Sequence, residues 1–147
     1  YLAIGDNPIS DITAVSKLTN LTTLGISVVG NLDTTALAGL SNLMHLSLSD
    51  NQISDISGLA GLVNLQQLHL DRNQITDVSP LIGLINIREL TLSHNGISDI
   101  TALVENTGLG AGDVLTLTYN SFDRWEGSKD RLDIEALVAR GVQVSYF

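Results

Sequence analysis

Serine, histidine and aspartate are the side chains in this sequence that could support hydrolysis or bind a metal ion. Ser47, His69 and Asp71 together supply the residue types of a hydrolytic triad. Such a triad also requires an oxyanion hole and a cleft that excludes water. His45 and His69 could share a zinc ion, but a zinc site needs three or four ligands held at about 2 Å. What these residues can do therefore depends on the elements that carry them.

Both segments that carry these residues, LMHLSLSDN (43–51) and LQQLHLDRN (65–73), have the pattern of short strands. Leucines alternate there with polar residues at a period of two, which is typical of a strand with one buried face. The polar residues would then stand on the open surface of a sheet, which offers neither an oxyanion hole nor a closed cleft. The histidine spacing also matches no metal motif. We therefore predict that the chain is not an enzyme and has no catalytic residue, bound metal or cofactor.

A row of aspartates recurs at intervals of 22 residues. Five like charges in a row should repel one another unless each carboxylate accepts hydrogen bonds from the backbone. An aspartate just before a helical turn is a natural cap of that kind. We expect structural caps, with a row of calcium sites on the convex side as the alternative. The aspartates are Asp11, Asp33, Asp55, Asp77 and Asp99.

The same interval is the period of most of the chain. Residues 43–64, LMHLSLSDNQISDISGLAGLVN, are followed by LQQLHLDRNQITDVSPLIGLIN in residues 65–86. With Leu43 counted as position 0, apolar residues recur at positions 0, 3, 5, 10, 13, 16 and 19, and asparagine recurs at position 8. One such unit cannot bury its leucines alone, so the copies must stack on one another.

This LxxLxLxxNxI pattern, with a period of about 20 to 30 residues, is the signature of leucine-rich repeats. The chain resembles the 22-residue class found in bacterial internalins and in a phosphatase regulatory subunit. The resemblance implies an α/β fold: a right-handed solenoid with a parallel sheet on the concave side, short helical turns on the convex side, and a C-terminal helix-strand cap. It covers residues 1–147 as a single domain. The expected repeats are about 1–20, 21–42, 43–64, 65–86, 87–111 and 112–124, followed by the cap at 125–147.

Asparagine at position 8 has a structural reason. Where the chain leaves each strand, backbone groups lie inside the stack without sheet partners, and a side-chain amide can both donate to and accept from them. We therefore expect a structural ladder of asparagines along the solenoid. Its members are Asn7, Asn51, Asn73, Asn95 and Asn120.

The second repeat, residues 21–42, departs from the pattern. Val29 replaces the ladder asparagine, and Asn31 and Thr34 replace apolar residues. We interpret this departure as a reshaped loop. An irregularity that faces a partner is the alternative.

The fifth repeat is longer than the others. Leu90 and its equivalent Leu115 are 25 residues apart, so three residues have been inserted before the sixth strand. Gly110 and Gly112 in this insertion predict a turn with unusual backbone angles. A phosphate-binding loop would need a following lysine and a helix, and the strand-like LTLTYN (115–120) follows instead.

The C-terminal cap is predicted to contain a helix and an edge strand. Asp130 or Asp133 would cap the start of the helix, and Gly141 would end it. Trp125 would cover the last leucines of the stack, because a tryptophan in such a cap has a large apolar surface to bury. The helix residues expected to face the core are Ile134, Leu137 and Val138.

Composition restricts the partners of this domain. The 147 residues are 44% hydrophobic and 16% charged, with a net charge of −9 and no cysteine. No apolar run approaches the roughly 18 residues that would span a bilayer, and no basic segment could follow a phosphate backbone. We therefore expect no membrane insertion in this chain, no nucleic-acid partner and no disulfide chemistry.

The residues expected on the outer surface of the sheet differ between the two halves of the chain. Those of the first two repeats are small, whereas the later repeats offer long polar and aromatic side chains. Arginine and tyrosine are among the residues that most often dominate interface energies. An ordinary solvated surface is the alternative to a binding face. The expected binding residues on the concave face are His45, Gln67, His69, Asp71, Arg72, Glu89, His94 and Tyr119.

We predict a monomeric module for protein–protein recognition, with a glycan as an alternative ligand. The competing interpretation is a structural spacer or scaffold domain of a larger multidomain protein whose activity lies elsewhere. The resemblance to internalin repeats implies a bacterial protein that is secreted or displayed on the cell surface, with a cytoplasmic location as the alternative.

Overall fold

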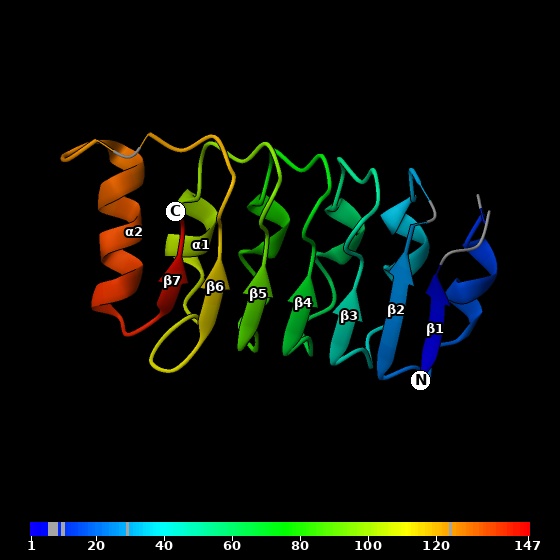
Figure 1. The fold of residues 1–147 in the computed structure, drawn as a ribbon. Helices are drawn as coiled ribbons and strands as arrows, with labels where there is room; N and C mark the ends of the chain where they lie inside the picture. Colours follow the sequence, from blue (N-terminus) through cyan, green and yellow to red (C-terminus); the bar gives the residue numbers. More distant parts are fainter. Residues whose placement is uncertain (6–8, 10, 29, 124) are drawn as a thin grey trace.

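Parallel strands from successive repeats form one open sheet in the computed structural model (Figure 1), which describes residues 1–147 except 6–8, 10, 29 and 124. The seven strands lie in the order in which they occur in the chain. This confirms the expected six repeat strands and one cap strand. The strands are β1 (Leu2–Gly5), β2 (Thr23–Ser27), β3 (His45–Ser47), β4 (Gln67–His69), β5 (Glu89–Thr91), β6 (Val114–Thr116) and β7 (Gln143–Ser145).

Short helical segments occupy the opposite, convex side of the stack (Figure 1). They are η1 (Thr13–Lys17), η2 (Thr34–Leu37), η3 (Ser57–Leu59), η4 (Ser79–Leu81) and α1 (Thr101–Glu105). A longer helix, α2 (Lys129–Ala139), follows at the C-terminal end. The fold is therefore the predicted leucine-rich repeat solenoid with a C-terminal helix. No helix in the described part of the chain is long and apolar enough to cross a membrane.

Leucines of successive repeats stack to form the core. Leu24 pairs with Leu46 between β2 and β3, and Leu90 pairs with Leu115 between β5 and β6. The three-residue insertion is therefore absorbed before β6. These four leucines are no more than 2% exposed. In β3, β4 and β5 one buried leucine lies between two partly exposed residues, which confirms the period of two.

The second repeat closes its core with different residues. Leu32 is buried, whereas Asn31 is exposed. Thr34 is also buried, and its hydroxyl group donates to the carbonyl oxygen of Asp55 at 3.1 Å and accepts the N–H of Gly58 at 3.3 Å. A Cβ at Gly58 would lie 2.1 Å from the carbonyl oxygen of Thr34, so only glycine fits there. The loop is therefore reshaped, as predicted.

The inserted loop before β6 is organised by a buried asparagine. The amide of Asn106 donates to a carbonyl oxygen of the preceding repeat at 2.8 Å, and its side-chain oxygen accepts the N–H of Gly108 at 2.8 Å. Gly112 has the positive φ of 90° that the sequence predicted for this turn. The same prediction for Gly110 is wrong: its φ lies outside the left-handed region, and its N–H donates to the Asp113 carboxylate at 2.9 Å.

The cap helix begins earlier than predicted. α2 starts at Lys129 and is capped by Ser128, whose side-chain oxygen accepts the N–H of Arg131 at 3.3 Å. The assignment of the cap to Asp130 or Asp133 is therefore wrong. Asp130 lies in the first turn, where a carboxylate complements the helix dipole, and Asp133 pairs with Lys129 at 2.8 Å.

Only part of the expected buried face of α2 is buried. Ile134 and Leu137 lie in the core, whereas Val138 is exposed, because the helix contacts α1 and β7 along a narrow stripe. Trp125 is 81% exposed, so the prediction that it covers the last leucines is wrong. Phe122 packs against the end of the core instead.

Candidate functional site: the concave face

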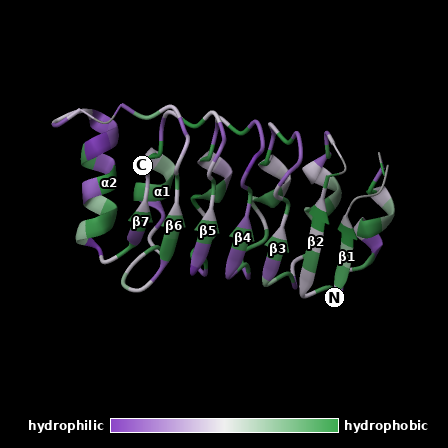
Figure 2. Ribbon diagram, in the orientation of Figure 1, coloured by the Kyte–Doolittle hydropathy of each residue, from purple (hydrophilic) through white to green (hydrophobic). Residues whose placement is uncertain are grey.

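The eight predicted binding residues all lie on the open surface of the sheet, which we call the concave face. They come from β3, β4 and β5 and from the turns that follow β4, β5 and β6. Figure 2 shows hydrophilic residues along β4 and β5, whereas β1 is mainly hydrophobic. Hydrogen bonds and ring contacts divide these residues into a central polar network of five and three residues at the rim.

The central network crosses three strands. Nδ1 of His45 and Oε1 of Gln67 lie 2.9 Å apart, and Nε2 of Gln67 donates to Oε2 of Glu89 at 3.0 Å. Nε2 of His69 lies 3.9 Å from Oε1 of Glu89. Each of the four side chains thus contacts a side chain on an adjacent strand. These contacts order the four side chains before any ligand binds.

A second branch of this network is centred on Asp71. Its carboxylate accepts hydrogen bonds from the hydroxyl group of Thr91 and, at 2.8 Å, from the N–H of Ser93. The hydroxyl group of Thr91 also lies 3.5 Å from Nδ1 of His69, and Thr118 donates to the hydroxyl oxygen of Ser93 at 2.9 Å. The Asp71 carboxylate is therefore committed to the backbone and side chains of the next repeat.

These contacts do not assemble a hydrolytic triad. Ser47 and His69 are register partners on β3 and β4, but the contacts of the His69 ring are to Glu89 and Thr91 on β5. Asp71 likewise contacts Thr91 rather than His69. The three residue types are close in the sheet, yet the His69 and Asp71 side chains contact Glu89, Thr91 and Ser93 instead.

The rim of the concave face has an unusual backbone. In the second to sixth repeats, the residue at position 7 has a φ of 54° to 58°, although none of these residues is glycine. This left-handed conformation costs an L-residue roughly 1–2 kcal/mol. In the third to sixth repeats it turns the chain off the strand, so that the asparagine at position 8 bonds to backbone carbonyl groups inside the stack. The residues are Val28, Asp50, Arg72, His94 and Tyr119.

Two pairs form along this rim. Nη1 of Arg72 lies 3.2 Å from Oδ1 of Asp50, and both side chains remain largely exposed. The rings of His94 and Tyr119 stack with their centroids 4.2 Å apart and their planes 14° from parallel. Tyr119 is nevertheless 66% exposed. The rim therefore offers one charged pair and one aromatic pair to solvent.

Beneath the rim, the asparagines at position 8 bond to the backbone of their own and neighbouring repeats. The amide of Asn73 donates to the carbonyl oxygens of Leu48 at 2.9 Å and Leu70 at 3.1 Å, and its oxygen accepts the N–H of Ile53 at 3.0 Å. The amides of Asn51, Asn95 and Asn120 donate to backbone carbonyls in the same way. Asn7 and Val29 lie outside the described residues.

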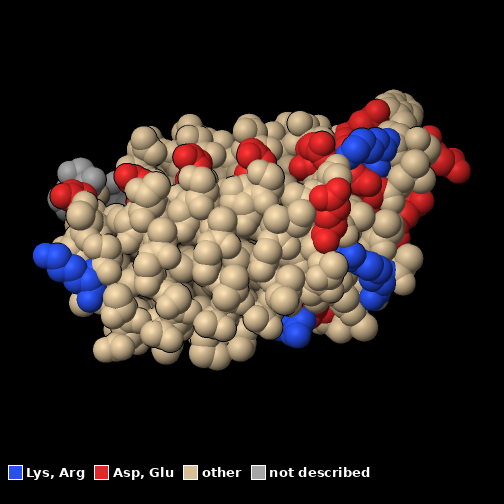
Figure 3. Space-filling view, turned by 180° about the vertical axis from the view of Figure 1, so that it is seen from behind, with Lys and Arg blue, Asp and Glu red and all other residues tan. Residues whose placement is uncertain are grey.

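The row of aspartates runs along the convex side, where Figure 3 shows acidic residues at regular intervals. One carboxylate oxygen of each accepts the backbone N–H two residues later, at 2.7 to 2.9 Å. Asp33 is the N-terminal capping residue of η2, whereas the other four precede the capping residue by one position. Among the described residues, no group of three or more His, Cys, Asp or Glu side chains could hold a metal ion.

Hydrogen bonds lower the pKa of several of these carboxylates. The side-chain and backbone bonds from Thr13 lower the pKa of Asp11, and those from Thr35 lower the pKa of Asp33. The pKa of Asp99 falls furthest, because Thr101 donates from its side chain and backbone and Lys129 adds a third hydrogen bond. The hydrogen bonds of Lys129 to Asp133 and Asp99 in turn raise the pKa of Lys129 to about 12.

Comparison with known proteins identifies the repeats. A model of two copies of leucine-rich repeats matches residues 41–83, and a single leucine-rich repeat model matches residues 83–100. The solved structure of internalin C2 from Listeria monocytogenes superposes with a TM-score of 0.80 at 33% identity, over 99% of this chain and 60% of that chain. The chain is built of leucine-rich repeats that are similar to those of bacterial internalins.

A second internalin of the same species, internalin F, matches all of this internalin-like chain, with a TM-score of 0.81 and 32% identity. The chain spans 60% of the length of the internalin C2 structure and 40% of the internalin F structure. No curated protein sequence matches the chain.

Sequence reasoning missed the partners that hold the internalin-like concave face together. Thr91 and Ser93 bond to Asp71, and Asp50 pairs with Arg72, yet only Asp71 and Arg72 were expected. The repeat pattern could have predicted these partners, because residues at equal or nearby positions of adjacent repeats lie side by side. Asp50 and Arg72 both occupy position 7, and Thr91 and Ser93 occupy positions 4 and 6 of the next repeat.

Proposed function

We propose that this internalin-like domain recognises a partner protein with the C-terminal half of its concave face. The observation that carries the proposal is the pre-organised set of polar and aromatic side chains on consecutive repeats. Arg72 and Tyr119 protrude from it, each about two-thirds exposed, while neighbouring side chains fix their positions. Side chains that are already ordered lose less conformational entropy when a partner binds.

The N-terminal half of the same surface is a natural contrast. Its outward residues include Ala3, Thr23, Gly25 and Ser27, which offer little area and few functional groups. Large side chains that lose much water on binding dominate most interfaces. The energetic centre of a complex should therefore lie over β4, β5 and β6 rather than over β1 and β2.

The dimensions of the face suit a protein ligand. Seven strands at a spacing of about 4.8 Å give a surface roughly 30 Å long. Such a surface can bury about 800 Å² on each partner, the size of a standard protein–protein interface. The proposal includes no catalytic step, because the contacts of the His69 and Asp71 side chains are to residues of the next repeat rather than to each other. We further propose that the protein acts outside the bacterial cell, secreted or on the surface, and as a monomer.

Site-specific photo-cross-linking tests the proposed face. A photoreactive phenylalanine analogue at Tyr119 should capture one discrete protein from extracts of the bacterium's environment or host. The matched control carries the same analogue at Ile82, an exposed residue at the end of η4 on the convex side. Capture from Tyr119 and not from Ile82 would support recognition by the concave face. Equal capture, or none, would favour the spacer interpretation.

A further inference from the structure

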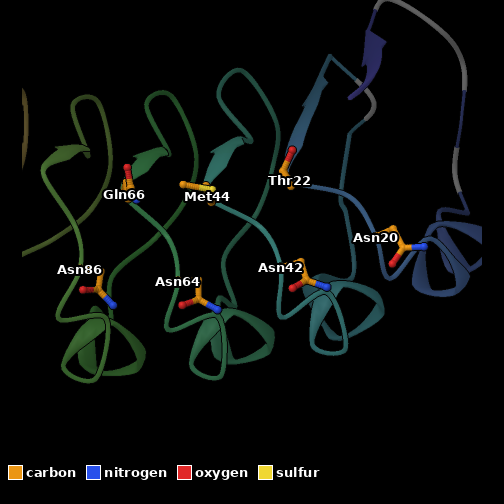
Figure 4. Close-up of a pocket in the computed structure, with 7 residues that line it drawn as sticks. All are labelled: Asn20, Thr22, Asn42, Met44, Asn64, Gln66 and Asn86. Carbon is orange, nitrogen blue, oxygen red and sulfur yellow. The ribbon is translucent and has the colours of Figure 1, made fainter.

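A trough of about 490 Å³ runs along the edge of the solenoid where the convex turns lead into the strands (Figure 4). It is separate from the concave face, because none of the eight residues of that face lines it. One wall is a row of asparagines contributed by four successive repeats, and the other wall is formed by the residues that precede the strands. The lining residues are Asn20, Thr22, Asn42, Met44, Asn64, Gln66 and Asn86.

The asparagine wall is rigid and regularly spaced. The amide of Asn42 donates to the carbonyl oxygen of Thr19 at 2.9 Å, and that of Asn64 donates to the carbonyl oxygen of Ser41 at 2.9 Å. Asn86 repeats this bond one coil later at 2.8 Å. An amide has two N–H donors and an acceptor oxygen. Each bond uses one donor, which leaves one donor and the oxygen of each asparagine to serve a ligand.

The trough carries no charge. All seven lining residues are neutral. The residue that would extend the Gln66 row, Arg88, instead lies 3.4 Å from the carboxylate of Asp113. Burying an unpaired charge is costly. The trough therefore suits a ligand with many hydroxyl or amide groups and no charge.

The free groups of the wall favour one kind of neutral polymer. Asn42, Asn64 and Asn86 occupy the same position of successive repeats, so one free donor and one free acceptor recur in each coil. The backbone groups of an extended peptide each only donate or only accept. Each hydroxyl group of a sugar can both donate and accept, so it can bond to either free group of an asparagine. We propose that this trough binds a neutral linear glycan, with the asparagine row bonding to hydroxyl groups of consecutive sugars and Met44 lying against an apolar ring face.

Titration with defined oligosaccharides tests this site by its location as well as by its affinity. Maltohexaose, xylohexaose and chitotetraose would each be added, to about 5 mM, to the ¹⁵N-labelled protein. At least one should shift the side-chain amide signals of Asn42, Asn64 and Asn86 with a dissociation constant in the millimolar range or tighter. Gln66→Ala and Met44→Ala should each weaken this binding about fivefold. Gln74→Ala, which removes an exposed glutamine outside the trough, is the matched control and should leave it unchanged.

Three results would overturn the assignment. The first is that none of the oligosaccharides moves these amide signals. The second is that the shifts persist unchanged in Gln66→Ala and Met44→Ala proteins whose melting temperatures equal that of the parent. The third is that a neutral glycine–serine peptide of similar length binds the trough more tightly than every oligosaccharide. Each outcome leaves the proposal for the concave face untouched, because the two surfaces share no residue.

Discussion

The imidazole ring of His94 stacks on the phenol ring of Tyr119, with 4.2 Å between the ring centroids. Both residues have left-handed backbones, with φ of 57° and 58°. The two rings face each other because both residues occupy position 7 in consecutive repeats and therefore leave the sheet in the same direction. The pair forms a single aromatic surface at the rim of the concave face. The same backbone conformation has a measurable cost elsewhere in this row.

Val28 occupies position 7 of the second repeat with a φ of 56° and an exposed side chain. A β-branched residue is a poor occupant of this conformation, whereas asparagine tolerates it. Val28→Asn should therefore raise the free energy of unfolding by about 0.5–1 kcal/mol. Urea denaturation measures the change, and the control is Val63→Asn, which replaces another exposed valine outside the left-handed row. A destabilised Val28→Asn protein would show that the side chain makes a contact more valuable than the strain it carries.

Asn73 should contribute strongly to the stability of the protein. Asn73→Ala leaves the buried N–H of Ile53 without its present partner. It also removes one of the two asparagine hydrogen bonds to each of the carbonyl oxygens of Leu48 and Leu70. We expect a loss of about 1–3 kcal/mol in the free energy of unfolding. Gln74→Ala, at the adjacent exposed position, should change it by less than about 0.5 kcal/mol. Equal effects of the two substitutions in chemical denaturation would refute a structural role for the ladder.

Calcium should not stabilise the protein. Each aspartate in the row uses one oxygen for a backbone N–H, and the described residues contain no group of three or more side chains suited to a metal. The melting temperature in millimolar calcium should equal that in excess chelator. A ligand that binds only the native state must raise the melting temperature, so a rise of several degrees with calcium would establish a site in the row.

The capping aspartates should make stability depend on pH in the acid range. The pKa of Asp11, Asp33, Asp55 and Asp99 lies below the ordinary value of 3.8 in the folded protein. The unfolded state therefore binds protons first as the pH falls, and stability that is fully present above about pH 5 is lost through pH 4 and below. Denaturation at a series of pH values measures this loss.

Asp99 offers a direct check of the cause. Its carboxyl group should titrate at the lowest pH of the row in NMR, because Lys129 adds a hydrogen bond to those from Thr101. Lys129→Ala should raise the pKa of Asp99 and leave that of Asp33 unchanged. If the pKa of Asp99 does not move, its low value must come from Thr101 alone.

The repeat determines almost all of the fold in advance, because positions separated by one period must become lateral neighbours. The pairing of Leu90 with Leu115 across a three-residue insertion follows from that rule. The cap is less predictable because it has no period: Ser128 rather than Asp130 or Asp133 caps its helix, and Trp125 is exposed to solvent. The same limit applies to the concave face. The orientation of the His69 ring depends on its contacts with Glu89 and Thr91 rather than on its position in the repeat.

The affinity of a partner for variants of the concave face tests the central proposal most directly. The triple variant His69→Ala, Arg72→Ala, Tyr119→Ala removes three partly or largely exposed side chains outside the core and should remain folded. Calorimetry with a captured partner should give a dissociation constant more than about tenfold weaker than that of the parent protein. Thr23→Ala with Ser27→Ala, on the N-terminal half of the same surface, should have little effect. An affinity that survives the triple change but falls when Ile82 on the convex side is replaced by aspartate would contradict recognition by the concave face.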